Sequence, residues 1–532
     1  MTLSPSSISL DELMDDSPQF TLTSEQEAIL LAAKGSQTSL MITAMAGCSK
    51  STVLEVIARS LPKVSTCYVV FNKKNQVEAE RKFGDRNSKL AHFGDASHVV
   101  IKTANGLGHS AWSRAIGKRL TLDTKKVFNL VKETITKENL RSIDRGDFTA
   151  IMQLVSKART AGIVPKSHST VRGLLPDDWD SWEQLADQLY LDLNEDLLYV
   201  ARKCLTECIR QSYQGTIDFD DQIYMSALFG GVFDRYAVLL LDESQDLSPI
   251  NHLQIKRAAA GRLIVVGDPR QAIYAFRGAD SSSMDSLRQL RLDWIDLPLS
   301  TTFRCPKILV ERQQSHAQGF QAHESNPEGM FLDLSSKEWR LPPGQVAILC
   351  RNNAPLFAAA LRIIKSGSGC TILGSEIGKG LINVSKKIVP QDSTSLADAR
   401  VLVLEHFERE IQKAIANQKD SKAEILEDRK DCLLAVLDNI KGSTMGDARR
   451  ALESMFSKDN LRIVLSTGHK AKGLEWPTVV HLDPWRIPSK WAKEALAAGN
   501  SVAYNQDMNL RYVIETRAQE TLILANLENF QP

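Results

Sequence analysis

A lysine and a hydroxyl stand side by side at Lys50–Ser51, inside the segment AMAGCSKST at 44–52. An apolar run precedes this segment and an apolar helical pattern follows it, which predicts a strand, a tight loop and a helix. Backbone amides in such a loop, together with the positive end of the helix, bind phosphate groups. A lysine there neutralises phosphate charge, and the next hydroxyl is a ligand for Mg²⁺. The predicted nucleotide-phosphate residues are Ala46, Gly47, Cys48, Ser49, Lys50, Ser51 and Thr52.

This loop departs from the usual glycine pattern of phosphate loops, G-x-x-x-x-G-K-[ST]. The two glycine positions fall on Met45 and Ser49, and Gly47 is the glycine that the loop retains. A serine in a backbone conformation that favours glycine costs about 1–2 kcal/mol, or it forces a different loop. We therefore expect either strain or an altered loop at Ser49.

Two adjacent carboxylates follow an apolar run later in the chain, in AVLLLDESQD at 237–246. Ligands of parallel sheets bind at the carboxyl ends of the strands, where Asp242 and Glu243 would lie. Asp242 can hold Mg²⁺ together with Ser51, and Glu243 can orient and deprotonate an attacking water. An acidic helix cap is the alternative, but the phosphate loop upstream favours one shared site.

Similar apolar runs recur along the chain, and each ends in a polar or glycine-rich cluster. They lie at 39–43, 67–71, 98–103, 237–242, 262–268, 346–350, 462–467 and 478–483. Nearly continuous apolar strands followed by helical patterns are typical of a parallel sheet covered on both faces. An early and a late group of strands therefore predict two α/β lobes. A long segment with helical periodicity interrupts each group, so we expect a helical insertion in each lobe.

Length and composition limit the protein class. A chain of 532 residues is long enough for several domains, and 43% hydrophobic residues suffice for sizeable cores. The net charge of +1 shows no whole-chain attraction to nucleic acid, although a local basic groove can lie within a balanced total. Neither a signal-peptide pattern nor a run of about 18 apolar residues is present. We therefore expect a soluble cytoplasmic protein.

Eight cysteines are scattered without a Cys-x-x-Cys pair, which favours a reducing compartment over a disulfide scaffold. Cys204 and Cys208 are four residues apart on a predicted helix, so they can share a metal or pack in a core. Packing is favoured because no His or Cys stands near them. The mixed charges of the later helical segment allow a coiled-coil partner site, but a solvated helical subdomain fits the pattern better.

Segments spread in order over about residues 20–525 resemble the motifs of the UvrD/Rep-type superfamily 1 helicases. They are LTSEQEAIL (22–30), AMAGCSKST (44–52), YVVFNKKNQVEAE (68–80), IKTANGLGHSAW (101–112), IDFDDQIYMSAL (217–228), LDESQD (241–246), VVGDPRQAIYAFRGAD (265–280), LSTTFRCP (299–306), AILCRNNAP (347–355), LSTGHKAKGLEWP (465–477) and NLRYVIETRAQETL (509–522). The resemblance implies two RecA-like P-loop NTPase lobes with parallel sheets, which bind ATP and Mg²⁺ between them.

The resemblance also implies roles for individual residues around the nucleotide. The implied catalytic residues are Lys50, Asp242, Glu243, Gln271, Arg304 and Arg517. Arg304 and Arg517 would act as arginine fingers, with Arg517 completing the site only when the lobes close. Further nucleotide contacts are implied at Gln26 for the adenine edge, Phe303 for stacking on adenine and Glu475 for the ribose.

Single-stranded DNA contacts are implied at Phe71, Asn72, Thr103, Tyr274, Phe276, Arg277, Arg351, Asn352, His469 and Lys470. Aromatic faces stack on any base at about 1–3 kcal/mol each, which suits a motor that ignores sequence. Tyr274 and Phe276 can also be core aromatics, because their period-two spacing fits a half-buried strand. If DNA is the partner, the basic residues should concentrate along the path of the strand.

On this resemblance the chain divides into a polar N-terminal tail, two split lobes and two insertions. The expected ranges are 1–18 for the tail, 19–112 and 216–300 for the first lobe, 113–215 for its insertion, 301–384 and 458–532 for the second lobe, and 385–457 for a reduced second insertion. The short insertions support the motor core more strongly than processive strand separation. The compact form is most similar to phage-type or Fbh-like members.

The sequence therefore predicts an ATP-dependent DNA helicase or single-stranded DNA translocase with 3′-to-5′ polarity. It would act on single-stranded DNA and on single-strand/duplex junctions, as a monomer in a bacterial or phage-infected cell, with replication or repair proteins as partners. The alternative is a nucleotide-gated DNA-binding protein with weak ATPase activity, which the altered phosphate loop at Ser49 suggests. A fused nuclease is disfavoured because no carboxylate cluster follows the last motif.

Overall fold

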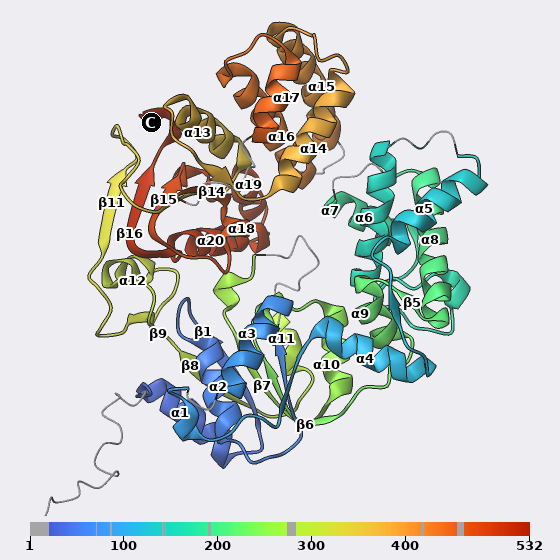
Figure 1. Cartoon of the computed structure of the whole chain (residues 1–532), viewed down its shortest axis with the longest axis vertical. Coiled ribbons are helices and arrows are strands. Elements are labelled where there is room, and N and C mark those ends of the chain that lie inside the picture. Colours follow the sequence, from blue (N-terminus) through green and yellow to red (C-terminus); the bar gives the residue numbers. More distant parts are fainter. Residues whose placement is uncertain are drawn as a thin grey trace, which may run out of the picture.

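The computed structural model describes residues 21–70, 72–85, 88–140, 143, 145–189, 193–273, 283–416, 420–454 and 462–532. Within these ranges the chain forms two lobes, each built on a six-stranded parallel sheet, with a helical domain beside each lobe (Figure 1). The predicted α/β fold with two parallel sheets is confirmed. The tail predicted at 1–18 lies outside the described residues.

The first lobe arranges its strands in the order β3-β2-β6-β7-β1-β8. Their bounds are β1 Ser39–Ala44, β2 Thr66–Val70, β3 Val99–Thr103, β6 Tyr236–Leu241, β7 Ala259–Gly267 and β8 Trp294–Leu299. The surrounding helices are α1 Ser24–Gly35, α2 Lys50–Ser60, α3 Lys73–Gly84, α10 Pro249–Ala258 and α11 Ser283–Arg288. Alternate residues of one strand enter two separate cores: Leu40 and Ile42 pack on one face and Met41 on the other. Both faces of the sheet are therefore covered, as the continuous apolar runs require.

The second lobe arranges its strands in the order β11-β16-β15-β12-β14-β13. Their bounds are β11 Met330–Leu334, β12 Val346–Cys350, β13 Thr371–Ile372, β14 Ile463–Thr467, β15 Trp476–Leu482 and β16 Ala518–Ala525. Its helices are α12 Lys307–Gln313, α13 Asn353–Lys365, α18 Gly468–Ala471, α19 Lys490–Ala497 and α20 Val502–Glu515. Ile348 and Leu349, neighbours on β12, again enter different cores.

All eight apolar runs correspond to strands of these two sheets, whereas four further strands carry weak sequence signals. Strand β8 contains Asp296 and Pro298, and both are tolerated because β8 lies at an edge of its sheet. Strand β11 lies at an edge of the other sheet, and its residues stay partly or largely exposed. Strand β13 has only two residues, and the first half of β16 is polar.

The segment between the two sheets belongs partly to each lobe. Short strands β9 (Thr301–Thr302) and β10 (Gln321–Ala322) pair with each other outside both large sheets. Cys305 and Phe320 pack into the core of the first lobe, whereas Leu309 packs into a core of the second. The expected lobe boundary at 300/301 thus coincides with the end of β8, but packing with the first lobe continues to about β10.

The first insertion is a helical domain attached to the first lobe through α4 (Ala104–Ile116) and α9 (Phe219–Leu228). Its helices are α5 Lys126–Lys137, α6 Arg145–Ala161, α7 Trp179–Gln188 and α8 Glu195–Gln214, and the short strands β4 Thr121–Leu122 and β5 Thr216–Ile217 pair at its base. Cys204 and Cys208 are buried in the core of this domain, as the packing interpretation requires.

The second insertion consists of α14 Ser375–Ile388, α15 Leu396–Ala416, α16 Asp420–Asn439 and α17 Met445–Ser454. It begins ten residues before the expected start at 385, because α14 packs with α15 to α17. Its buried side chains, such as Phe407 and Leu433, continue the core of the second lobe without a break. Helix α16 also contacts α7 of the first insertion, so the two helical domains touch each other. Among the described helices, none combines the length and apolar character needed to cross a membrane.

Candidate active site

The phosphate loop joins β1 to α2, and two of its residues have left-handed backbones. Gly47 has φ +72°, and a Cβ there would lie 2.5 Å from Thr302 Oγ1 and 2.6 Å from the Cβ of Arg304. Ser49, which caps α2, has φ +57°. The loop therefore keeps the glycine-type conformation at Ser49 and carries the associated strain, the first of the two outcomes expected from the sequence.

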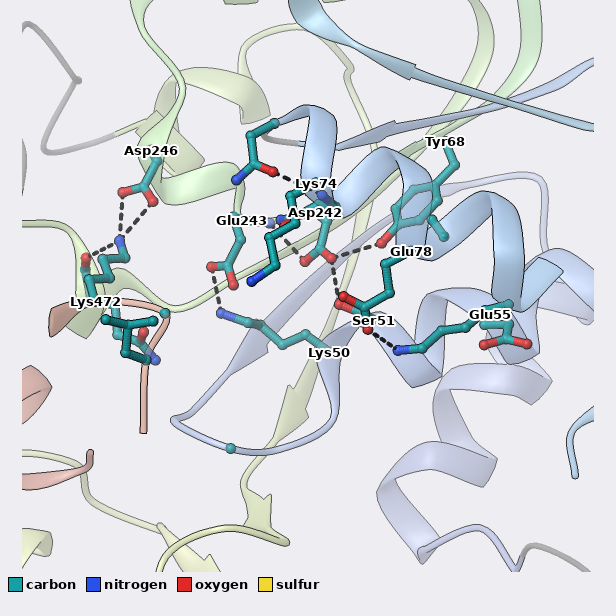
Figure 2. A pocket seen from close by; sticks show the side chains of 18 of the residues that line it. Lys50, Ser51, Glu55, Tyr68, Lys74, Glu78, Asp242, Glu243, Asp246 and Lys472 are labelled. Carbon is teal, nitrogen blue, oxygen red and sulfur yellow. Dashed lines mark hydrogen bonds and ion pairs between the residues drawn. The ribbon is translucent and has the colours of Figure 1, made fainter. Parts of the chain in front are cut away.

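The predicted metal ligands are in direct contact. Ser51 Oγ donates to Asp242 Oδ2 over 2.7 Å, and the hydroxyl of Tyr68 donates to the same oxygen over 2.8 Å (Figure 2). The amide of Glu243 donates to the other oxygen, Asp242 Oδ1, over 2.9 Å. A hydroxyl and a carboxylate held together in this way form the oxygen donor set that Mg²⁺ prefers.

The lysine of the phosphate loop pairs with the predicted general base. Lys50 Nζ lies 2.6 Å from Glu243 Oε2, and Gln245 donates to the same oxygen over 2.7 Å. Burial favours the neutral form of Glu243, but the charges of Lys50 and Lys472 outweigh burial and lower its pKa to about 2. For Asp242, burial and the neighbouring Glu243 charge raise the pKa instead. Glu243 is thus ionised at neutral pH and can accept a proton.

The second lobe supplies a buried cation to the same cavity. Arg517 is 1% exposed, and its guanidinium donates to the carbonyls of Val513 and Leu474 over 2.9 and 3.4 Å. Among the described residues no carboxylate forms an ion pair with it. Burial and the nearby charge of Arg304 lower its pKa to about 10. An uncompensated buried guanidinium is a binding group for an anion such as a phosphoryl oxygen.

The cavity at this junction has a volume of about 560 Å³ and is lined by residues of both lobes. Its lining includes Gly47, Lys50, Ser51, Asp242, Glu243, Gln271, Arg304 and Arg517, which are predicted site residues. The Arg304 guanidinium lies 2.5 Å from Glu475 Oε2, the predicted ribose ligand. The structure thus brings the phosphate loop, both carboxylates and both arginines together. Within the described residues, no cluster of three or more His, Cys, Asp or Glu side chains suggests any other metal site.

The predicted adenine-binding residues come from the start of α1 and from the segment that follows β9. Gln26 forms a capping box with Thr23 at the start of α1, and its side-chain Nε2 is buried without a hydrogen-bond partner. Phe303 stacks on His323 with 4.6 Å between ring centroids, and its amide donates to the Gly47 carbonyl over 3.0 Å. An orphaned amide donor and a partly exposed aromatic face are suitable for a nucleobase.

Other predicted nucleotide-binding residues already form hydrogen bonds or core contacts within the protein. The amide of Ala46 donates to the hydroxyl of Tyr512 over 2.8 Å, and Cys48 is buried in the first-lobe core. Burial raises the pKa of the Cys48 thiol well above its usual value. Ser49 and Thr52 are partly buried at the start of α2. Only some of the predicted loop residues therefore offer free groups to a phosphate.

The predicted DNA residues lie in different surroundings. Asn72 and Thr103 cap α3 and α4, where their side chains accept hydrogen bonds from Asn75 and Gly106 amides. Asn352 caps α13, and His469 and Lys470 belong to α18. Phe71, Tyr274, Phe276 and Arg277 lie outside the described residues.

The predicted DNA contact at Arg351 is paired with carboxylates of the protein itself. Its guanidinium pairs with Glu424 of α16 and lies 2.9 Å from Asp507. Burial disfavours its charged form, but the two carboxylates outweigh burial and raise its pKa. Arg351 therefore links the second lobe to its insertion in this structure, instead of presenting a free charge to a strand.

Sequence reasoning missed three contacts at the site. Lys472 Nζ of the second lobe lies 2.7 Å from both Asp246 oxygens and donates to the Gln271 carbonyl over 2.6 Å. The hydroxyl of Tyr68 donates a hydrogen bond to Asp242, and the hydroxyl of Tyr512 accepts one from the amide of Ala46. Lys472 belongs to the same motif as Lys470, so the motif could have pointed to it. Only the assembled lobes show that Lys472 contacts the first lobe.

Two family models match the chain. The UvrD/REP helicase N-terminal domain matches residues 22–290, and the UvrD-like helicase C-terminal domain matches residues 409–529. The chain is 26% identical to F-box DNA helicase protein 1 of Schizosaccharomyces pombe, over 94% of this chain and 57% of that protein. It is 24% identical to ATP-dependent DNA helicase UvrD2 of Mycobacterium tuberculosis, over 55% of this chain and 47% of that protein.

The chain is also 23% identical to ATP-dependent DNA helicase PcrA of Bacillus subtilis, over 48% of this chain and 36% of that protein. It thus spans about half the length, or less, of these curated relatives. The predicted resemblance is nevertheless confirmed, because the N-terminal family model alone covers half of the chain and a second model covers the end of the other lobe. The chain belongs to the UvrD/Rep family of ATP-dependent DNA helicases.

Proposed function

We propose that this protein is an ATP-driven motor that hydrolyses ATP with Mg²⁺ and moves 3′-to-5′ along single-stranded DNA. The observation that carries the proposal is Arg517, a buried cation of the second lobe without a carboxylate partner among the described residues, in a cavity that also holds Lys50 and Glu243. A site divided in this way is complete only when the lobes are together, which couples nucleotide occupancy to lobe movement.

The residues present are suitable for a magnesium nucleotide. Ser51 and Asp242 are already hydrogen bonded to each other and would hold the metal. When bound, Mg²⁺ supplies positive charge beside the phosphoryl oxygens. The orphaned Gln26 amide would receive the base. Each of these groups thus has an unused or exchangeable polar atom.

The chain's own groups then account for hydrolysis. Lys50 pairs with Glu243 in this structure and would transfer to the phosphates, which releases the Glu243 carboxylate. The Lys50 charge is a main cause of the low pKa of Glu243, so its departure raises that pKa and makes the carboxylate a better acceptor for the proton of the attacking water. Arg517 and Arg304 would place guanidinium donors beside the developing charge, and Arg304 must first leave Glu475.

Single-stranded DNA would lie across the carboxyl ends of the strands of both parallel sheets. The helix-capping residues Asn72, Thr103 and Asn352 would contact it there. The 3′-to-5′ polarity follows the family resemblance. The two short insertions, which meet at α7 and α16, favour a compact motor that acts as a monomer on single strands and junctions. The partner proteins would be those of replication or repair.

The test has two parts. Purified full-length protein should show ATPase activity that single-stranded DNA stimulates, and Lys50→Ala or Glu243→Gln should abolish it. Strand displacement should occur on a 3′-tailed duplex and not on 5′-tailed or blunt duplexes. ATPase without DNA stimulation, or full turnover in either variant, would refute the motor.

The left-handed backbone at Ser49 favours a second candidate, a nucleotide-gated DNA-binding protein that remodels or recruits partners without unwinding. Ser49→Gly discriminates between the two, because glycine removes the strain while Lys50 and Ser51 remain. A large gain in ATPase would support weak hydrolysis as the native state. An unchanged rate would support a competent loop, and Asn139→Gly, which changes another left-handed residue outside the cavity, is a matched control.

A further inference from the structure

We propose that Tyr68 is a positioning residue of the magnesium site: its hydroxyl holds Asp242 in the orientation that faces Ser51 and so sets the affinity for the metal. The inference rests on the proposed function, because it concerns the metal that accompanies ATP. It adds a side chain from β2, a strand that supplies none of the predicted site residues described in the structure.

The contact is direct and specific to one oxygen. Tyr68 Oη donates to Asp242 Oδ2 over 2.8 Å, and Ser51 Oγ donates to that same oxygen over 2.7 Å (Figure 2). The Glu243 amide donates to Asp242 Oδ1 over 2.9 Å. Three donors therefore fix both oxygens of the carboxylate, and two of them are side chains.

The tyrosine ring is itself held rigidly. Strand β2 lies between β3 and β6, and the Asp242 amide donates to the Val69 carbonyl over 3.3 Å, which ties the two strands together beside the site. The ring of Tyr68 is 2% exposed and stacks on Phe83 of α3, with 5.3 Å between centroids and an angle of 4° between planes. Burial and the stack therefore hold the hydroxyl toward Asp242.

The two side-chain donors differ in what they can do when a cation is present. Ser51 can turn its oxygen toward a metal, and it then gives up its hydrogen bond to Asp242. Tyr68 is buried and held by its stack on Phe83, so it would keep its bond and become the side chain that holds Asp242 in place. Removing such an outer partner of a metal ligand typically weakens metal affinity by about 10- to 100-fold.

The experiment measures metal binding without hydrolysis. Full-length wild type and Tyr68→Phe are titrated with Mn²⁺ in the presence of a non-hydrolysable ATP analogue, and free Mn²⁺ is followed by electron paramagnetic resonance. Tyr68→Phe keeps the ring and its stack on Phe83, so we expect Mn²⁺ affinity to fall about tenfold. Binding of a fluorescent ATP analogue in EDTA should stay within about twofold of wild type, since Lys50 and the loop are unchanged.

Tyr236→Phe is the matched control. Tyr236 is a buried tyrosine of β6 in the same sheet, and its hydroxyl lies 3.5 Å from Asp234, which does not belong to the site. Its removal should leave Mn²⁺ affinity unchanged. A second variant, Phe83→Leu, removes the stack but keeps the hydroxyl, and should shift Mn²⁺ affinity in the same direction by a smaller factor.

Wild-type Mn²⁺ affinity in both Tyr68→Phe and Phe83→Leu would overturn the proposal, as would an equal loss in Tyr236→Phe. Thermal melting checks that each variant is folded, and Phe83→Leu decides the question if Tyr68→Phe does not fold. The readout needs neither DNA nor turnover. If the wild type lacks DNA-stimulated ATPase, the proposed motor fails while the metal result stands by itself.

Discussion

Replacing Arg517 by glutamine should make the protein more stable and almost inactive. The pKa of Arg517 falls from an ordinary value of 12.5 to about 10 in the folded protein. A shift of one unit corresponds to about 1.36 kcal/mol, so burying this charge costs roughly 3 kcal/mol of folding free energy at pH 7. The sign follows from linkage: a lowered pKa penalises the protonated form, and the penalty persists at every pH below about 10.

Part of the stability gained by removing this charge is lost with the hydrogen bonds that Arg517 donates to the Val513 and Leu474 carbonyls and to Thr516 Oγ1. Two of these three bonds are long, at 3.4 Å, so their combined loss of about 2 kcal/mol leaves a net stabilisation of about 1 kcal/mol in Arg517→Gln. ATPase turnover should fall, because an arginine finger contributes about 10³- to 10⁵-fold to turnover. On this reasoning the same residue would cost stability and supply catalysis.

Urea denaturation followed by circular dichroism gives the stability, and a coupled ATPase assay with single-stranded DNA gives turnover. Arg362→Gln is the matched control, because Arg362 also donates to backbone carbonyls, those of Leu527 and Phe530, but lies outside the cavity. It should lose a little stability and keep its ATPase. A lower denaturation midpoint in Arg517→Gln, or turnover within tenfold of wild type, would refute the reasoning.

Three further outcomes are expected. Gly47→Ala should abolish ATP binding, measured with a fluorescent analogue, because its Cβ would meet Thr302 Oγ1 at 2.5 Å. Lys472→Met should destabilise the protein by about 3–5 kcal/mol in urea, since it leaves the Asp246 carboxylate buried and unpaired, and adding Asp246→Asn should restore most of the loss. The pKa of Glu243 is lowered in the folded protein. Its contribution to stability is therefore complete above pH 4.5, its ordinary pKa, and disappears as the pH falls toward 2. Acid-unfolding curves of wild type and Glu243→Gln should therefore converge below that window and diverge above it.

The sequence was most informative where one physical requirement dominated. Buried parallel strands must be apolar along their whole length, and all eight such runs are strands of the two sheets. The phosphate loop and Asp242–Glu243 were predicted for a similar reason, since Mg²⁺ and phosphate chemistry restricts residue type at a fixed place relative to a strand, and the structure brings these residues into contact. Edge strands β8 and β11 were not predicted, because partly exposed strands need not be apolar along their whole length.

Contacts between distant segments could not be predicted in the same way. Nothing in the local sequence of Tyr68 distinguishes a core tyrosine from one that donates to Asp242, because the distinction depends on the neighbouring strand β6. Likewise, Arg351 follows a strand as a DNA-contact residue would, but Glu424, 73 residues later, pairs with it. Such pairings depend on how the lobes and insertions pack.

The contact between Tyr512 and Ala46 bears on the order in which the protein matures during synthesis. The two residues are 466 positions apart, and Tyr512 also fills part of the first-lobe core. At about 5–20 residues per second, translation needs roughly 25–90 s to cover that interval. During this time the nascent first lobe lacks a core side chain and the group that caps its phosphate loop. A newly made chain should therefore acquire its finished nucleotide pocket only when α20 emerges, late in its own production.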